Sequence, residues 1–337
     1  MNAPQIAWLP DGGRLHMNHG PIDLIVEAFG AETERRAAYA QAAVRFRTIL
    51  EELVAELPEL RRPALPGQPR AFAGSTARRM EAACVPLART FITPMAAVAG
   101  SVADEMLAAL VAGRDLERAY VNDGGDIAIH LSPGRSMRLA IAGTGHALTD
   151  RAEIGVSSPV RGVATSGWRG RSFSLGIADA VTVLARSAAE ADAAATIIAN
   201  AVDLPGHAAI MRKPANELAP DTDLGALPVT VGVGELSGSE IERALQRGLA
   251  AAEDLRRRGL IEAAALFLAG RMTVCASDAT ATAFDGPPPP LRGGGSCVDA
   301  APSVDLPRST WEADNAKRGR CGVEVAEPQP AFEVIHA

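Results

Sequence analysis

The spacing of hydrophobic residues changes several times along the chain, and these changes predict the secondary structure. Apolar residues recur every three or four positions where one side of a helix is buried, and every second position where one face of a strand is buried. The helical spacing predicts helices at 32–57, 77–85, 96–111, 187–202 and 239–258, and a further helix running into a short strand at 261–274. Pro58 and Pro63 are expected to stop the first helix, and Gly113 to close the third.

Alternating or continuously apolar stretches predict the strands of a sheet. They lie at 15–26, 118–122, 127–131, 137–142, 163–164, 178–185 and 229–233. The strands come in runs joined by tight turns, without a regular alternation of strand and helix. This order favours an α+β fold, with a mixed, mostly antiparallel sheet flanked by helices, over a doubly wound parallel sheet.

A change of composition after residue 276 divides the chain. The segment 277–337 contains a run of four prolines and a run of three glycines. It has too little apolar material to offset the entropy lost on ordering. We therefore expect one folded domain over residues 1–276 and a largely disordered, Pro/Gly-rich tail over 277–337.

Charge and composition narrow the class of partner. The 337-residue chain has a net charge of −7 and only 4% aromatic residues, so it offers little to a nucleic-acid backbone or to stacked bases. The start of the chain lacks the pattern of a signal peptide, and the most apolar stretch, 95–111, is broken by Asp104 and Glu105. We expect a cytoplasmic protein without nucleic-acid or membrane partners. Its four cysteines have no zinc-ligand spacing and are expected to be free thiols.

The stretch ADAAAT at 191–196 is the first candidate for a functional motif. Asp192 and Thr196 are four positions apart, so they share one side of a helix. Ser187 and Glu190 form a capping box, which places Asp192 about one turn inside that helix. A carboxylate and a hydroxyl in this arrangement suit a hard cation such as Mg²⁺, and the alanines between them would let a ligand or another backbone approach closely. The alternative is an ordinary alanine-rich helix with an acid near its N-terminus.

The stretch NDGGD at 122–126 lies between two predicted strands. Asp-Gly in this context is the usual signature of a hairpin turn. The second glycine and Asp126 go beyond what a turn needs, and they suit a loop whose amides and carboxylate face a ligand. Both interpretations stay open.

Thr165, Ser166 and Gly167 follow a short predicted strand. Two hydroxyls and a permissive backbone could hold a phosphate. A plain turn is the alternative.

Together these motifs resemble those of the ApbE-like superfamily, whose best-known members are flavin transferases that bind FAD and move FMN onto a protein threonine with Mg²⁺. The superfamily carries an Asn-x-Gly-Gly-Asp loop, a Thr-Ser-Gly turn, a Val-Thr-Val strand and a helix with Ala-Asp-x-x-x-Thr. Here the same features occur in the same order at 122–126, 165–167, 181–183 and 191–196. The resemblance covers roughly residues 10–275, and the phrases ATSG, GIADAVTVLA and ADAAAT are most like a short, uncharacterised bacterial and archaeal (UPF) branch.

This resemblance implies a set of site residues. The metal ligands would be Asp192, Thr196 and the main-chain carbonyl of Ala99. The implied residues for FAD or FMN and its phosphates are Asn122, Gly124, Gly125, Asp126, Thr165, Ser166 and Gly167. The candidate catalytic bases are Asp126 and Asp179. The implied partners are a nucleotide or flavin and an acceptor protein.

One departure from the superfamily keeps several functions open. The transferases carry His-Ile-Ile-Asp-Pro before the Val-Thr-Val strand, whereas residues 171–179 here read RSFSLGIAD, with neither the His nor the Pro. Mg²⁺-dependent transfer or hydrolysis at the FAD pyrophosphate is one hypothesis. A non-catalytic protein that holds a flavin or another small metabolite for a redox or catabolic enzyme is the second. An unrelated small-molecule enzyme that reuses the fold is the third.

Overall fold

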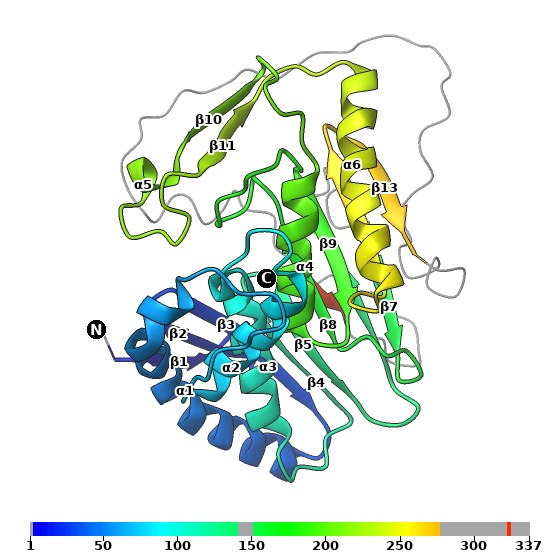
Figure 1. Ribbon diagram of the computed structural model, residues 1–337. Coiled ribbons are helices and arrows are strands. Elements are labelled where there is room, and N and C mark those ends of the chain that lie inside the picture. The colour runs from blue at the N-terminus through cyan, green and yellow to red at the C-terminus, as the bar shows by residue number, and fades with distance from the viewer. Residues whose placement is uncertain (1–2, 141–150, 277–321, 325–337) are drawn as a thin grey trace, which may run out of the picture.

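A computed structural model describes residues 3–140, 151–276 and 322–324. Its centre is a nine-stranded sheet in which every neighbouring pair of strands is antiparallel (Figure 1). The strand order is β1 (Gln5–Trp8), β2 (Leu15–His19), β3 (Ile22–Phe29), β4 (Arg118–Asp123), β5 (Asp126–Leu131), β8 (Gly162–Ser166), β9 (Ala180–Ala185), β12 (Ala263–Leu268) and β13 (Arg271–Cys275).

One face of this sheet is covered by the helices α1 (Glu32–Leu60), α3 (Val98–Val111), α4 (Ala188–Ala201) and α6 (Gly238–Arg257) (Figure 1). Helix α2 (Ser75–Cys84) packs on α1, α3 and α4. Helix α3 contacts β4 and β5, α4 contacts β8 and β9, and α6 contacts β12 and β13. Two short 3₁₀ turns, η1 (Val85–Leu87) and η2 (Pro94–Ala97), connect α2 to α3. The helices thus follow the order of the strands that they cover.

A small second sheet covers part of the opposite face. It consists of β14 (Gly322–Glu324), β6 (Ser136–Ala140) and β7 (Arg151–Gly155). Met137, Leu139 and Ile154 pack on Tyr120 and Ile127 of the main sheet. A two-stranded arm of β10 (Ile210–Pro214) and β11 (Pro228–Val233), with the short helix α5 (Ala215–Leu218), extends beyond the end of α4 (Figure 1). The prediction of an α+β fold with a mostly antiparallel sheet flanked by helices is confirmed.

The predicted helix at 261–274 is wrong, because this segment forms the hairpin of β12 and β13. All six residues of Ala263–Leu268 are buried, since β12 lies between two other strands and is covered on both faces. A short, fully apolar run has no alternation, so its period cannot separate a buried strand from a buried helix.

The end of the first helix also differs from the prediction. Helix α1 continues through Pro58 to Leu60, so the proline lies in its last turn. Proline lacks an amide proton and thus forgoes the bond to the carbonyl four residues earlier. That carbonyl belongs to the exposed Val54, where water can take its place.

Two other expectations concern the ends of the domain and the membrane. The predicted tail, 277–337, lies outside the described residues apart from β14, and so do positions 141–142 of one predicted strand. Within the described ranges, Pro94–Val111 alone is long and apolar enough to cross a membrane, and half of that stretch is buried in the fold. It comprises η2 and α3, which pack between α1, α2 and α4.

Candidate functional site

The NDGGD stretch forms the connection between β4 and β5. Asp123 and Asp126 are directly opposite one another across the hairpin, and the two glycines between them have φ angles of +64° and +117°. Only glycine adopts such angles readily, which explains the pair. The Asn122 side-chain oxygen accepts the Gly125 amide at 2.8 Å. The stretch therefore forms a hairpin turn, and we call residues 122–126 the acidic turn.

Three carboxylates from two segments gather beside this turn, and we call Asp123, Asp126 and Asp192 the carboxylate cluster. Burial, and then the neighbouring Asp126, raises the pKa of Asp123 to about 8. Burial and the Asp192 carboxylate raise the pKa of Asp126 well above its usual value. Burial raises the pKa of Asp192 to about 7, with contributions from Asp123 and Asp104 that nearby backbone amides oppose. Each carboxylate thus lies close enough to disfavour the ionised form of another.

One arginine faces the cluster. A Cβ added to Gly124 would lie 2.6 Å from Nη2 of Arg171, so the guanidinium rests directly on the acidic turn. Arg171 is exposed, and its charge opposes the rise in the pKa of Asp123 and Asp126. The sequence reasoning missed both Asp123, which was explained by the hairpin, and Arg171. The only available signal for Arg171 was its place in the segment that departs from the superfamily pattern.

Asp192 is held at the crossing of α3 and α4. Its Oδ2 accepts the Gly100 amide at 3.0 Å, which places it beside the Ala99–Gly100 backbone at the start of α3. The structure therefore places the Asp192 carboxylate on the amide side of the Ala99–Gly100 peptide, whereas the carbonyl of Ala99, the predicted metal ligand, points the opposite way along α3. Thr196 is half-buried one turn further along α4.

The alanines of ADAAAT pack against protein. Ala193, Ala194 and Ala195 are at most 1% exposed and belong to the core between α4, the sheet and α6. A Cβ on Gly100 would lie 2.2 Å from the carbonyl oxygen of Ala188. The small residues at this crossing therefore allow the backbones of α3 and α4 to approach closely, and they do not make room for a ligand.

The predicted residues on β4, β5 and β8 divide between the two faces of the sheet. Side chains alternate between the faces along a strand, which puts Asn122 of β4 and Thr165 of β8 on the face covered by the small sheet. The same alternation puts Asp126 of β5 on the face covered by the helices. Thr165 nevertheless meets Asp126, because its amide donates to Asp126 Oδ1 at 3.2 Å. Its hydroxyl pairs with that of Thr182 on β9 at 2.9 Å. The acidic turn and the Thr-Ser-Gly segment therefore meet at one end of the central strands β4, β5 and β8.

Gly167 and Asp179 form a tightly packed corner next to this end of the strands. A Cβ on Gly167 would lie 2.5 Å from the Asp179 carbonyl oxygen. The Asp179 carboxylate accepts hydrogen bonds from Trp168 Nε1 at 3.2 Å, Arg169 Nε at 2.6 Å and the Ala269 amide at 2.6 Å. Asp179 therefore joins this corner to the β12–β13 turn.

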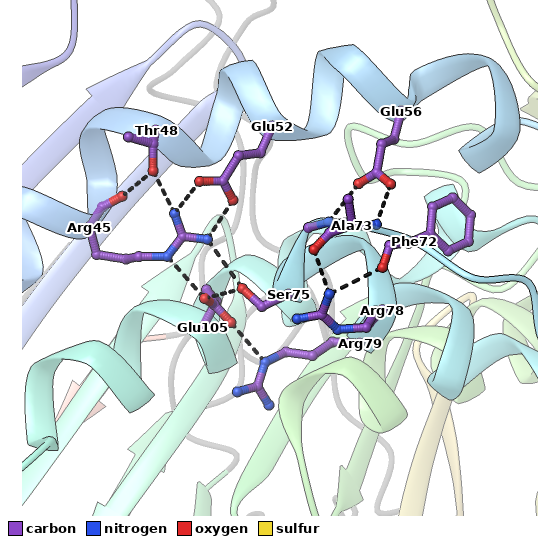
Figure 2. Close-up of polar contacts among 11 residues, drawn as sticks. Arg45, Thr48, Glu52, Glu56, Phe72, Ala73, Ser75, Arg78, Arg79 and Glu105 are labelled. Carbon is purple, nitrogen blue, oxygen red and sulfur yellow. Dashed lines mark hydrogen bonds and ion pairs between the residues drawn. The ribbon is translucent and has the colours of Figure 1, made fainter.

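Two cavities were not expected from the sequence, and neither is lined by the carboxylate cluster. The first, of about 500 Å³, lies between α1 and the start of α2. Figure 2 shows that its charged side chains bond one another or the backbone. Arg45 donates to Glu52 at 2.7 Å and to Glu105 at 2.9 Å, and Glu56 accepts the amides of Ala73 and Gly74. The second, of about 420 Å³, lies between the loop after α4 and α6.

The donor set beside the acidic turn is compatible with a cation. In the described part of the chain, no three His, Cys, Asp or Glu side chains converge as metal ligands. The metal site implied by the resemblance is not such a group, because Asp192 is its only acidic side chain and its other ligands would be the Thr196 hydroxyl and the Ala99 carbonyl. The raised pKa values show that the three carboxylates disfavour one another's ionised forms, and a bound cation would favour those forms.

Comparison with known proteins identifies the family. The model of the family described as "AbpE bacteria" matches residues 6–274. The chain belongs to this family. A UPF0280 protein of Methanopyrus kandleri is 33% identical over 175 residues, which cover 50% of this chain and 67% of the relative. A UPF0280 protein of Methanothrix thermoacetophila is 37% identical over 164 residues, covering 48% of this chain and 67% of the relative. The predicted membership of the ApbE-like superfamily, in its UPF0280 branch, is confirmed.

A solved structure also resembles this member of the AbpE bacteria family. It is the apo form of the flavinyl transferase ApbE from Pseudomonas stutzeri, with a TM-score of 0.42 and 14% identity. The match covers 85% of this chain and 99% of that chain. At this level the likeness says nothing about activity.

Proposed function

We propose that this protein binds the pyrophosphate of FAD, or the phosphate of FMN, at the acidic turn and acts there as a Mg²⁺-dependent flavin transferase or pyrophosphatase. The observation that carries the proposal is that the acidic turn, the Thr-Ser-Gly segment and the Asp192 region of α4 meet at one end of the central strands. Asp126 accepts the Thr165 amide and lies near Asp192, which is itself bonded to the start of α3. Membership of the AbpE bacteria family supports the proposal.

In this proposal Asp192 and Thr196 would hold Mg²⁺ together with oxygens of the pyrophosphate. Bound Mg²⁺ would neutralise pyrophosphate charge and polarise the bond that breaks. The amide of the exposed Gly124 and the exposed guanidinium of Arg171 would orient the phosphates. Thr165 and Ser166 would line the phosphate end of the ligand.

The reaction would be a displacement at the phosphorus of the FMN half. An acceptor hydroxyl or water forms a new P–O bond, the bond to the AMP phosphate breaks, and AMP leaves with the electron pair. The proton of the attacking oxygen passes to a carboxylate. Asp126 is the better-placed base because it accepts the Thr165 amide and so lies beside the Thr-Ser-Gly segment, whereas the oxygens of Asp179 already accept three hydrogen bonds.

The test is AMP release from FAD, followed by chromatography with and without Mg²⁺. Wild-type protein should release AMP only with Mg²⁺, and Asp192→Asn and Asp126→Asn should each lose this activity. Asp115→Asn, which changes an exposed aspartate after α3, is the matched control and should retain it. Asp192→Asn releasing AMP at the wild-type rate would overturn the assignment.

The alternative is a flavin-binding protein without transfer, and the departure at residues 171–179 favours it. In that case the purified protein would retain FAD or FMN in a slowly exchanging form and release no AMP. Failure to bind either flavin, measured by thermal shift with and without Mg²⁺, would overturn both proposals.

A further inference from the structure

The cavity beside α6 contains two arginines without a partner. We call this space, of about 420 Å³, the α6 cavity; it is lined by Asp203, Leu204, Pro205, Gly206, His207, Arg243 and Arg247. Arg243 and Arg247 are one helical turn apart, so both project from the same side of α6. Neither forms an ion pair or a hydrogen bond with any other residue in the described ranges, and both are exposed.

The acidic groups around the α6 cavity are already paired. Asp203 accepts from Arg212 of the β10–β11 arm. Glu240 accepts from the amide and hydroxyl of Ser237 through one oxygen, both at 2.7 Å, and lies 2.9 Å from His207 through the other. These contacts leave the charges of Arg243 and Arg247 without a counterion.

His207 connects the loop that lines the cavity to α6. Its Nδ1 accepts the Ala209 amide at 3.2 Å, and its Nε2 lies 2.9 Å from Glu240. These contacts also order the loop after α4, whose turn is closed by the His207 amide on the Leu204 carbonyl at 3.1 Å. The wall opposite the arginines is therefore a fixed loop with apolar side chains from Leu204 and Pro205.

We propose that the α6 cavity binds the phosphate group of a small phosphomonoester. Two guanidinium groups on one helix side match the several oxygens of a tetrahedral dianion, which can accept paired hydrogen bonds from each. The cavity is larger than a phosphate ion alone requires and falls within the usual range for small-molecule sites. The organic part of the ester then packs on the exposed Pro205.

This site is separate from the carboxylate cluster. Asp192 is near the start of α4, whereas the loop that lines the α6 cavity follows its last residue, Ala201. At 1.5 Å per residue these positions are roughly 14 Å apart along the helix axis. The inference therefore stands without the proposed flavin site.

The contrast with the cavity at α2 supports the assignment. There, Arg45 bonds Glu52 and Glu105, and Arg78 bonds the Phe72 and Ala73 carbonyls, so the arginines are occupied within the protein (Figure 2). In the α6 cavity the arginines are left for a ligand.

The experiment is calorimetric titration of the full chain with phenyl phosphate and with inorganic phosphate, in EDTA to exclude metal-dependent binding. Wild-type protein should bind phenyl phosphate saturably, at one site, and more tightly than inorganic phosphate. Arg243→Gln and Arg247→Gln should each weaken binding about tenfold, and the double variant should lose it. Arg257→Gln is the matched control, because this exposed arginine of the same helix pairs with Asp254 away from the cavity.

Hydrogen exchange with and without phenyl phosphate locates the site, and slower exchange is expected at 203–207. Absence of saturable binding to wild-type protein would overturn the proposal, as would equal affinity in the double variant. Phenyl phosphate binding no more tightly than inorganic phosphate would overturn the assignment of an ester. All variants change exposed side chains, so circular dichroism should show an unchanged fold.

Discussion

Asp104 and Asp192 each cap the helix that carries the other. Asp104, on α3, accepts the amides of Ala188 and Ala189 at the start of α4, at 3.1 and 2.9 Å. Asp192, on α4, accepts the amide of Gly100 near the start of α3 at 3.0 Å. The first amides of a helix lack partners within it, and a carboxylate there also complements the helix dipole. The exchange fixes the two helix starts against one another and sets the position of Asp192.

Removing one side of this exchange should weaken the domain. Asp104→Ala leaves two buried amides without an acceptor, and we expect the free energy of unfolding to fall by about 1–2 kcal/mol. Asp104→Asn keeps an acceptor oxygen and should cost less. Urea denaturation measures both, with Asp115→Ala, at an exposed site, as the control. Equal stability of Asp104→Ala and wild-type protein would contradict the capping role.

The close crossing of α3 and α4 predicts a large effect at Gly100. A Cβ there would lie 2.2 Å from the Ala188 carbonyl oxygen, and a backbone atom cannot move aside as a side chain can. Gly100→Ala should therefore destabilise by about 3 kcal/mol or more, although alanine is the better helix former. Thermal unfolding gives the measurement. In the control, Gly13→Ala, the nearest atom to the new Cβ is 3.7 Å away, and a comparable loss there would refute the explanation.

The carboxylate cluster predicts a fall in stability as pH rises. In the unfolded chain these carboxyls titrate near 3.9, whereas in the folded protein the pKa of Asp123 is about 8 and that of Asp192 about 7. Between about pH 4 and pH 8 the folded protein therefore binds more protons than the unfolded chain. The contribution of these carboxyls to the free energy of unfolding is fully present below about pH 4 and is lost as the pH rises towards 8.

Asp123 should account for part of this loss of stability. Asp123→Asn cannot ionise, so its unfolding free energy should vary less between pH 5 and pH 8 than that of wild-type protein. Chemical denaturation at several pH values measures the difference, and Asp115→Asn should follow the wild-type curve. Parallel curves for Asp123→Asn and wild-type protein would show that Asp123 ionises normally in the fold.

Asp179 should prove important for stability whatever its part in chemistry. Its carboxylate joins Trp168 and Arg169 to the Ala269 amide. Asp179→Ala removes three hydrogen bonds, one of them an ion pair, and should destabilise by about 2–3 kcal/mol. Urea denaturation measures the loss. Ser172→Ala, at a nearby exposed position, should be neutral, and equal stability of the two variants would contradict this anchoring role.

Much of the fold was predictable because most elements bury a single face. The alternation in β3, with buried residues at every second position, and the helical spacing in α6 follow from that arrangement. β12 was mispredicted because it is buried on both faces. Burial on both faces results from contacts with segments that are distant in the sequence. The spacing of hydrophobic residues within a segment does not reveal such contacts.

The candidate site was predictable only in part, for a related reason. Resemblance to a family pointed to Asp126 and Asp192, and the structure places them near one another. Arg171 is distant in sequence from the turn on which it rests, and Asp123 already had a sufficient explanation as a hairpin residue. Arg243 and Arg247 resemble any solvated pair on a helix until the loop after α4 is seen to line the same cavity.

The contact between Gly100 and Ala188 also bears on redesign of the protein. Since no larger residue fits there, any attempt to change ligand preference must leave the helix crossing, and with it Asp192, as it stands. The two glycines of the acidic turn are equally constrained, because their φ angles of +64° and +117° suit glycine alone. The exposed Arg171 has no such constraint, so libraries for new specificity belong at this position.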